Sequence, residues 1–97
     1  MKNETLEGMA KAELESDICG VIAGELLNKN RLKKEVTHSV FEYYSNAGNA
    51  VQLYQIQEVT ELMIASGQII QNITNGGFLL SLSPKYEATF LKVGGTD

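Results

Sequence analysis

Residues 68–82 read QIIQNITNGGFLLSL and hold the clearest structural signal in this chain of 97 residues. Two runs rich in β-prone residues, 68–73 and 78–82, lie on either side of the stretch Thr74-Asn75-Gly76-Gly77. Asn and Gly both accept the positive φ that the common two-residue hairpin turns require. The spacing therefore predicts a β-hairpin that reverses direction within this stretch.

The second run of the hairpin has an alternating pattern. Phe78, Leu80 and Leu82 are apolar and alternate with Leu79 and Ser81. Because successive side chains of a strand point to opposite faces, the three apolar residues are expected to share one face. We expect that face to cover the helices.

Three helices are predicted before the hairpin, from apolar residues that recur at helical spacing. Their expected ranges are residues 4–28, 31–45 and 50–66. The first helix can also be interpreted as two pieces, because Ser16 and Asp17 could cap a new start. The loop after the second helix holds Asn46 and Gly48, which tolerate the left-handed conformations that end a helix.

A short fourth helix is predicted after the hairpin. Ser83 suits the cap position and Pro84 the first helical position, which indicates a helix over residues 84–92. Residues 93–97 are expected to form a loose tail. The order of elements predicts an α+β fold, mostly α, in a single domain over residues 1–97, because so short a chain cannot build two cores.

The charge balance is acidic, with eight Lys and Arg against twelve Asp and Glu, a formal net charge of -4 and a pI near 4.9. This is the opposite of the footprint expected for a phosphate-binding protein. The first residues are polar and acidic where a signal peptide needs an apolar run, and no apolar run approaches bilayer-spanning length. We therefore expect a cytoplasmic protein without a membrane partner.

Candidate catalytic and metal-binding residues are few. Cys19 is the only cysteine, which excludes an internal disulfide and a cysteine-rich zinc site within one chain. His38, the only histidine, lies between Thr37 and Ser39, but adjacent residues on a helix point in different directions and do not form a triad. We expect no catalytic residue, no metal site, no cofactor and hence no enzymatic activity.

The order of elements over residues 50–92 resembles that of a winged-helix domain. The segment LMIASGQII, at residues 62–70, looks like the end of a winged-helix recognition helix that runs into its wing. The segment LSLSPKY, at residues 80–86, is similar to the one that leaves the wing for a final helix in such families. The resemblance implies that the third helix takes the recognition position and residues 74–77 the wing tip, which approaches the duplex in DNA-binding members.

The distribution of cationic residues argues against DNA binding through these two elements. No Lys or Arg lies between Lys34 and Lys85, so neither the third helix nor the wing can neutralise phosphate with a cationic side chain. The cluster at the start of the second helix comprises Lys29, Arg31, Lys33 and Lys34. It could contact phosphates, helped by backbone N–H groups, or it could be an ordinary solvated helix terminus.

The third helix has two distinct faces at about 100° per residue. The face expected to be buried comprises Val51, Ile56, Val59, Leu62 and Met63. The opposite face carries Gln57, Glu58 and Glu61, with Tyr54 beside them. Tyr is favoured at interfaces where one end of the side chain stays wet, and Tyr43 on the second helix is also expected to be exposed. The candidate partner-binding residues are therefore Tyr43, Tyr54, Gln57, Glu58 and Glu61.

These patterns support two hypotheses of different classes. The leading one is a small non-enzymatic protein–protein interaction module that binds a protein partner or a second copy of itself. The alternative is a small DNA-binding transcriptional regulator that uses the cluster from Lys29 to Lys34 for phosphates and its glutamines for bases.

Overall fold

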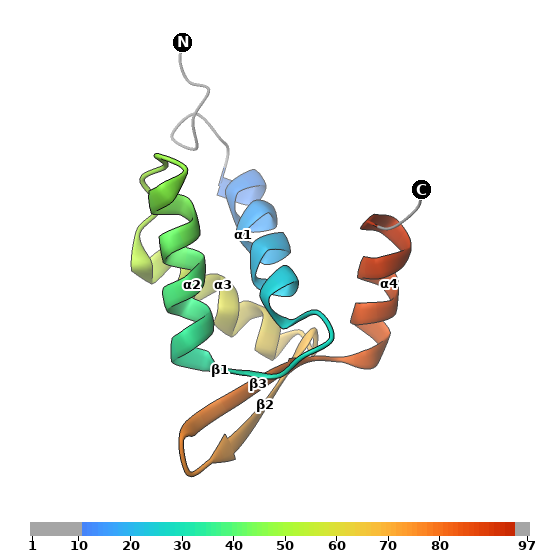
Figure 1. Cartoon of the computed structure of the whole chain (residues 1–97). Coiled ribbons are helices and arrows are strands. Elements are labelled where there is room, and N and C mark those ends of the chain that lie inside the picture. The colour runs from blue at the N-terminus through green and yellow to red at the C-terminus, as the bar shows by residue number, and fades with distance from the viewer. Residues whose placement is uncertain (1–10, 95–97) are drawn as a thin grey trace.

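The computed structural model describes residues 11–94, and the side chains of residues 11–89. In chain order the elements are α1 (Lys11–Leu26), β1 (Arg31–Leu32), α2 (Lys33–Asn46), α3 (Leu53–Ala65), β2 (Ile69–Thr74), β3 (Gly77–Leu82) and α4 (Pro84–Gly94) (Figure 1). The predicted α+β fold, mostly α, is confirmed. The part of the first predicted helix before residue 11, and residues 95–97 of the predicted tail, lie outside the described range.

The three helices α1, α2 and α3 lie together on one side of a small antiparallel sheet (Figure 1). The strand order is β1-β3-β2, and the hairpin of β2 and β3 extends away from the helices. Its register runs from Ile69 opposite Leu82 to Thr74 opposite Gly77. The hairpin therefore forms where the sequence predicts it.

The turn uses a different backbone solution from the expected one. Neither Asn75 nor Gly76 has a positive φ; the positive value, 124°, belongs to Gly77. The hydroxyl of Thr74 accepts a hydrogen bond from the Gly76 N–H at 3.2 Å and donates one to the Gly77 carbonyl at 2.8 Å. These side-chain bonds satisfy backbone groups within the turn, so the reversal does not depend on left-handed residues at its centre.

One strand was missed by the sequence prediction. Arg31 and Leu32 form β1 and pair with Leu80 and Leu79 of β3, so α2 begins at Lys33 and not at residue 31. A strand of two residues shows no alternation in the sequence. Its conformation is decided by the tertiary partner, which lies far away along the chain.

The remaining boundaries differ by a few residues. α1 is one continuous helix through Ser16 and Asp17, which settles the alternative of two pieces. α3 begins at Leu53 and not near residue 50. Gln52 has an extended backbone and caps the helix, and its N–H donates to the Gln55 side chain at 2.7 Å. α4 continues to Gly94, two residues into the expected tail, because glycine is tolerated at a helix end.

The start of α4 follows the predicted capping. The Ser83 hydroxyl accepts a hydrogen bond from the Tyr86 N–H at 3.2 Å, and Pro84 occupies the first helical position. The helix stands apart from the other three (Figure 1). Among its described contacts is a bond from the Asn28 N–H, just after α1, to the Glu87 carboxylate at 2.9 Å.

One apolar core joins the first three helices to the sheet. Its buried members are Ile18, Ile22, Ala23, Leu26, Val36, Val40, Tyr44, Val51, Ile56, Val59, Met63, Ile69, Leu80 and Leu82. Tyr44 reaches out of this core with its hydroxyl, which donates to Asp17 on α1 at 2.5 Å between the oxygens.

Two apolar residues expected to be buried are exposed instead. Leu62 is 55% exposed, because the buried stripe of α3 runs along Ile56, Val59 and Met63 and leaves Leu62 at its edge. Phe78 is 44% exposed, although Leu80 and Leu82 on the same strand face are buried. The helices cover only the inner end of the hairpin, and Phe78 lies nearer the turn.

Candidate partner-binding site

The outward face of α3 brings together most of the predicted partner-binding residues. Tyr54 is 60% exposed, and Gln57, Glu58 and Glu61 are exposed beside it. Leu62 adds apolar surface to this group. We call the exposed residues Leu53, Tyr54, Gln57, Glu58, Glu61 and Leu62 the α3 face.

Tyr43 does not belong to this face. It lies on α2, where it is 54% exposed and its ring meets that of Tyr44 edge to face, with 5.1 Å between centroids. It lies outside the grooves on both sides of α3, one toward α1 and one toward α2. The structure therefore separates Tyr43 from the other four predicted residues.

The first groove lies between the start of α1 and the α3 face. It encloses about 760 Å³, and its lining comprises Lys11, Glu15, Tyr54, Gln57, Glu58, Glu61, Leu62 and Ala65. We call it the α1–α3 groove. All four predicted residues of α3 line this groove, together with Leu62. The groove is therefore a depression that presents one aromatic side chain, Tyr54, and one exposed leucine.

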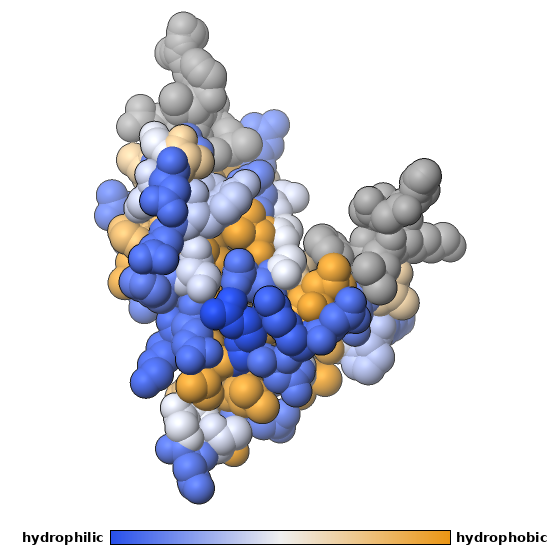
Figure 2. Space-filling view, in the orientation of Figure 1, coloured by the Kyte–Doolittle hydropathy of each residue, from blue (hydrophilic) through white to orange (hydrophobic). Residues whose placement is uncertain are grey.

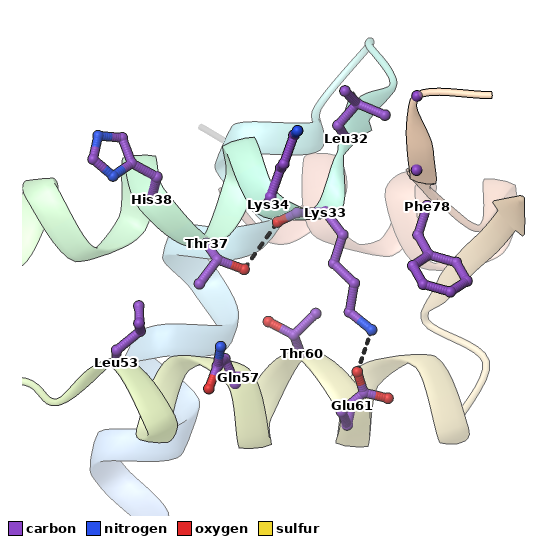
Figure 3. Close-up of a pocket in the computed structure, with 12 residues that line it drawn as sticks. Leu32, Lys33, Lys34, Thr37, His38, Leu53, Gln57, Thr60, Glu61 and Phe78 are labelled. Atoms are coloured by element: carbon purple, nitrogen blue, oxygen red, sulfur yellow. Dashed lines mark hydrogen bonds and ion pairs between the residues drawn. The ribbon is translucent and has the colours of Figure 1, made fainter. Parts of the chain in front are cut away.

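The second groove lies on the other side of α3, toward α2 and the hairpin turn (Figure 3). It encloses about 530 Å³, and its lining comprises Leu32, Lys33, Lys34, Thr37, His38, Leu53, Gln57, Thr60, Glu61, Gly76, Gly77 and Phe78. We call it the α2–α3 groove. Gln57 and Glu61 line both grooves, so the α3 face continues across the ridge of the helix.

An ion pair crosses the α2–α3 groove. The Lys33 ammonium at the start of α2 contacts the Glu61 carboxylate on α3 (Figure 3). The same ammonium lies 5.3 Å from the centroid of the Phe78 ring, within range of a cation–π interaction. Lys33 is therefore already satisfied by groups of its own chain.

The cationic cluster expected from the sequence is divided by such pairs. Arg31 contacts the Glu25 carboxylate of α1, and its other terminal nitrogen lies 3.4 Å from the Ser39 hydroxyl. Lys29 and Lys34 are exposed and form no ion pair within the described residues. Two of the four predicted phosphate-contacting residues thus have a carboxylate partner, which an incoming phosphate would have to displace.

The hydroxyl groups around His38 are engaged elsewhere. The ring Nε2 lies 3.1 Å from Glu42, one turn along α2. The Thr37 hydroxyl donates to the Lys33 carbonyl at 2.9 Å, and the Ser39 hydroxyl faces Arg31. The three neighbours form no hydrogen-bonded set, as expected from their directions on a helix.

Cys19 is half-buried in α1. Burial, followed by the nearby charge of Glu15, raises the pKa of its thiol, so the reactive thiolate is disfavoured. Its sulfur lies 4.0 Å from the side-chain oxygen of Gln68. In the described part of the chain no three His, Cys, Asp or Glu side chains gather in a metal-binding group, and no helix there is long and apolar enough to cross a membrane.

What the site could bind is inferred from the chemistry of its own residues. Comparisons with protein-family models, curated proteins and solved structures give no match. The α3 face offers a ligand apolar area from Leu53, Tyr54 and Leu62, and carboxylates from Glu58 and Glu61. Of these, the sequence pattern indicated only the polar residues and Tyr54; the exposure of the two leucines depends on how α3 packs.

Proposed function

We propose that the chain is a small non-enzymatic protein–protein interaction module of winged-helix-like architecture that binds a protein partner through the α3 face. The observation that carries the proposal is the exposure of Leu53, Tyr54 and Leu62 on one helix, at 44%, 60% and 55%. Protein interfaces place such aromatic and apolar residues at a central patch with polar groups around it. Gln57, Glu58 and Glu61 supply polar groups, which lie between these three side chains on the helix surface.

The winged-helix-like part of the proposal is supported by the order of the elements. α3 leads through Gly67 into the hairpin, and β3 leads through Ser83 and Pro84 into α4. The positive φ of Gly67, 86°, permits the sharp change of direction after α3. On this proposal α3 corresponds to the recognition helix, from which winged-helix proteins contact their ligands.

The chemistry of the face indicates the kind of partner. Glu58 is exposed and forms no ion pair within the described residues, whereas the exposed Glu61 is already paired with Lys33; α3 itself carries no cationic residue. A partner with an apolar patch bordered by Lys or Arg would complement this surface in both respects. A strongly acidic partner would be repelled.

The proposal is tested with a variant that removes the exposed anchors. Three immobilised proteins are compared for what they retain from a lysate of the source cells. They are the wild type, the double variant with both Tyr54→Ala and Leu62→Ala, and the control Tyr43→Ala. A protein retained by the wild type and the control but lost by the double variant is then purified and titrated. At least a tenfold loss of affinity is expected for the double variant, about 1.4 kcal/mol or more.

Equal retention by all three proteins would contradict the proposal. Tyr43 is a suitable control because it is a tyrosine of similar exposure, 54%, that lies outside both grooves. All three proteins should show the same circular dichroism, since the changed side chains are exposed.

The second candidate function is binding of duplex DNA. It is favoured by Lys29 and Lys34, which are exposed without an ion pair in the described residues. Fluorescence anisotropy of a labelled duplex, titrated at low and then rising salt, tests it. Affinity that falls steeply with salt would replace the interaction-module proposal, whereas flat anisotropy at high protein concentration would exclude the duplex as a ligand.

A further inference from the structure

The strand β2 forms an open edge of the sheet. The strand order β1-β3-β2 leaves one side of β2 without a strand in the described part of the chain, over all six of its residues. Natural edge strands are usually protected by Lys, Pro, a bulge or short length. Here no charged residue occurs between Glu61 and Lys85, and β2 contains no proline. With six residues in continuous register and neither charge nor proline, β2 lacks these four forms of protection.

We propose that β2 pairs antiparallel with β2 of a second copy of this chain. The two copies are related by a two-fold axis through Gln71, and they form one continuous sheet with three strands from each copy. In this register Gln71 faces Gln71 of the other copy, Ile69 faces Ile73, and Ile70 faces Asn72. The residue numbers of each opposite pair then differ by zero or an even number, so paired side chains lie on the same face. The helix-covered faces of both sheets therefore lie on the same side.

The sequence of β2 is self-complementary in this register. Ile73 is 82% exposed, the largest value among the exposed large apolar residues, and it pairs within its own hairpin with Phe78, which is 44% exposed. Pairing across the axis would place Ile73 beside Ile69 of the other copy, at the border of its core. Apolar surface on the hairpin, visible in Figure 2, would thereby be reduced on both copies.

Gln71 provides an independent reason for a partner at the axis. Its side-chain oxygen is buried and has no hydrogen-bond partner among the described residues. Buried polar atoms are rarely left in this state, because each costs free energy. Across the two-fold axis the two Gln71 side chains lie on the same sheet face, where rotation toward each other lets each amide oxygen accept an N–H of the other. A second copy therefore supplies the missing donor, which an unrelated strand would supply only if it had a matching residue.

Charge is consistent with a second copy as the occupant. Each copy has a formal net charge of -4, which opposes self-association in general. The uncharged stretch between Glu61 and Lys85 keeps this charge away from the shared edge. The contact is short, so we expect a weak dimer, in the class of interfaces below about 1,200 Å².

Sedimentation velocity of the full chain, from about 10 µM to about 1 mM, tests the proposal. The wild type is expected to shift from monomer to dimer over this range. Ile73→Lys is expected to remain monomeric, because in this register it replaces the apolar contact with Ile69 of the other copy by a charge that would have to be desolvated. Its fold should be unchanged, since the replaced side chain is 82% exposed.

The matched control is Leu62→Lys, which makes the same chemical change on the α3 face. It is expected to dimerise like the wild type. Loss of the dimer in Leu62→Lys but not in Ile73→Lys would assign self-association to the α3 face and overturn the edge pairing. A wild type that stays monomeric throughout would also overturn it, without bearing on the partner proposed for α3.

The register is tested by cross-linking in a Cys19→Ser background. Gln71→Cys would bring two thiols together at the axis, with Cα atoms about 5.5 Å apart, a distance that a disulfide spans. Asn72→Cys would place its thiols off the axis. Oxidation is expected to give a covalent dimer of the first variant and little of the second; the reverse yields would overturn the proposed register.

Discussion

The hydroxyl of Tyr44 on α2 donates a hydrogen bond to the carboxylate of Asp17 on α1, with 2.5 Å between the two oxygens. The ring is in the core, 1% exposed, while the carboxylate is on the surface. The bond therefore fixes how α1 and α2 lie against each other at the point where the core meets water.

Replacing Tyr44 by Phe should destabilise the fold while keeping the ring. Asp17 stays exposed and regains water, so the loss is the net value of the bond, about 1–2 kcal/mol. Urea denaturation measures it, and the exposed Tyr43→Phe serves as a control with an expected change within about 0.5 kcal/mol. Equal stability of both variants would show that the bond contributes nothing.

Stability should also fall at alkaline pH. Burial, then the hydrogen bond and the charge of Asp17, raises the pKa of Tyr44 above its ordinary value. The folded state therefore holds the phenol proton more tightly than the unfolded state. This contribution is complete below about pH 10, the pKa of an unfolded tyrosine, and is lost progressively as the pH rises above it.

The measurement is the urea midpoint between about pH 8 and about pH 11. Tyr44→Phe should show a smaller decline than the wild type over this range. Some decline should remain, because burial also raises the pKa of Tyr86. Identical declines in wild type and variant would refute the assignment to Tyr44.

Replacing Gln71 by Met should stabilise the monomer. The change removes a buried amide oxygen that has no partner in the described part of the chain, and it keeps the length of the side chain. We expect a gain of about 1 kcal/mol in the free energy of unfolding, measured at low protein concentration. The control Gln57→Met changes an exposed glutamine and should have little effect. A large loss of stability in Gln71→Met would mean that the amide is bonded within the monomer.

Removing the charge of Glu61 should free Lys33 for other anions. Glu61→Gln breaks the ion pair across the α2–α3 groove, whereas Glu58→Gln removes the same charge from α3 without touching that pair. Any residual affinity for a duplex should rise more in Glu61→Gln, and its dependence on salt should steepen by about one phosphate contact. Equal effects of the two variants would show that only net charge matters.

The local features of the fold could be predicted from the sequence because their causes are local. The hairpin follows from two β-prone runs around Asn75 and Gly76, and the start of α4 from Ser83 and Pro84. β1 could not be found in this way, since two residues carry no pattern and their strand conformation depends on β3. The turn was placed correctly, but its hydrogen bonds come from Thr74, which the pattern of Asn and Gly did not indicate.

The same distinction applies to the site. Helical periodicity placed Tyr54, Gln57 and Glu58 on one side of α3, and the structure brings them together. The ion pair of Lys33 with Glu61 joins two helices that are far apart in the sequence, so no local spacing of residues predicts it. Periodicity predicts a buried Leu62 because it tells which residues share a side of the helix, whereas the width of the buried stripe depends on the helices that pack against it.

The short strand β1 has a consequence for the order of folding. It joins Arg31 and Leu32 to a strand near the other end of the described chain, whereas β2 and β3 are neighbours connected by a two-residue turn. Hairpins close within microseconds, but pairing between distant segments must first overcome the entropy of closing a long loop. The sheet should therefore be completed late, with β1 docking onto a hairpin that already exists.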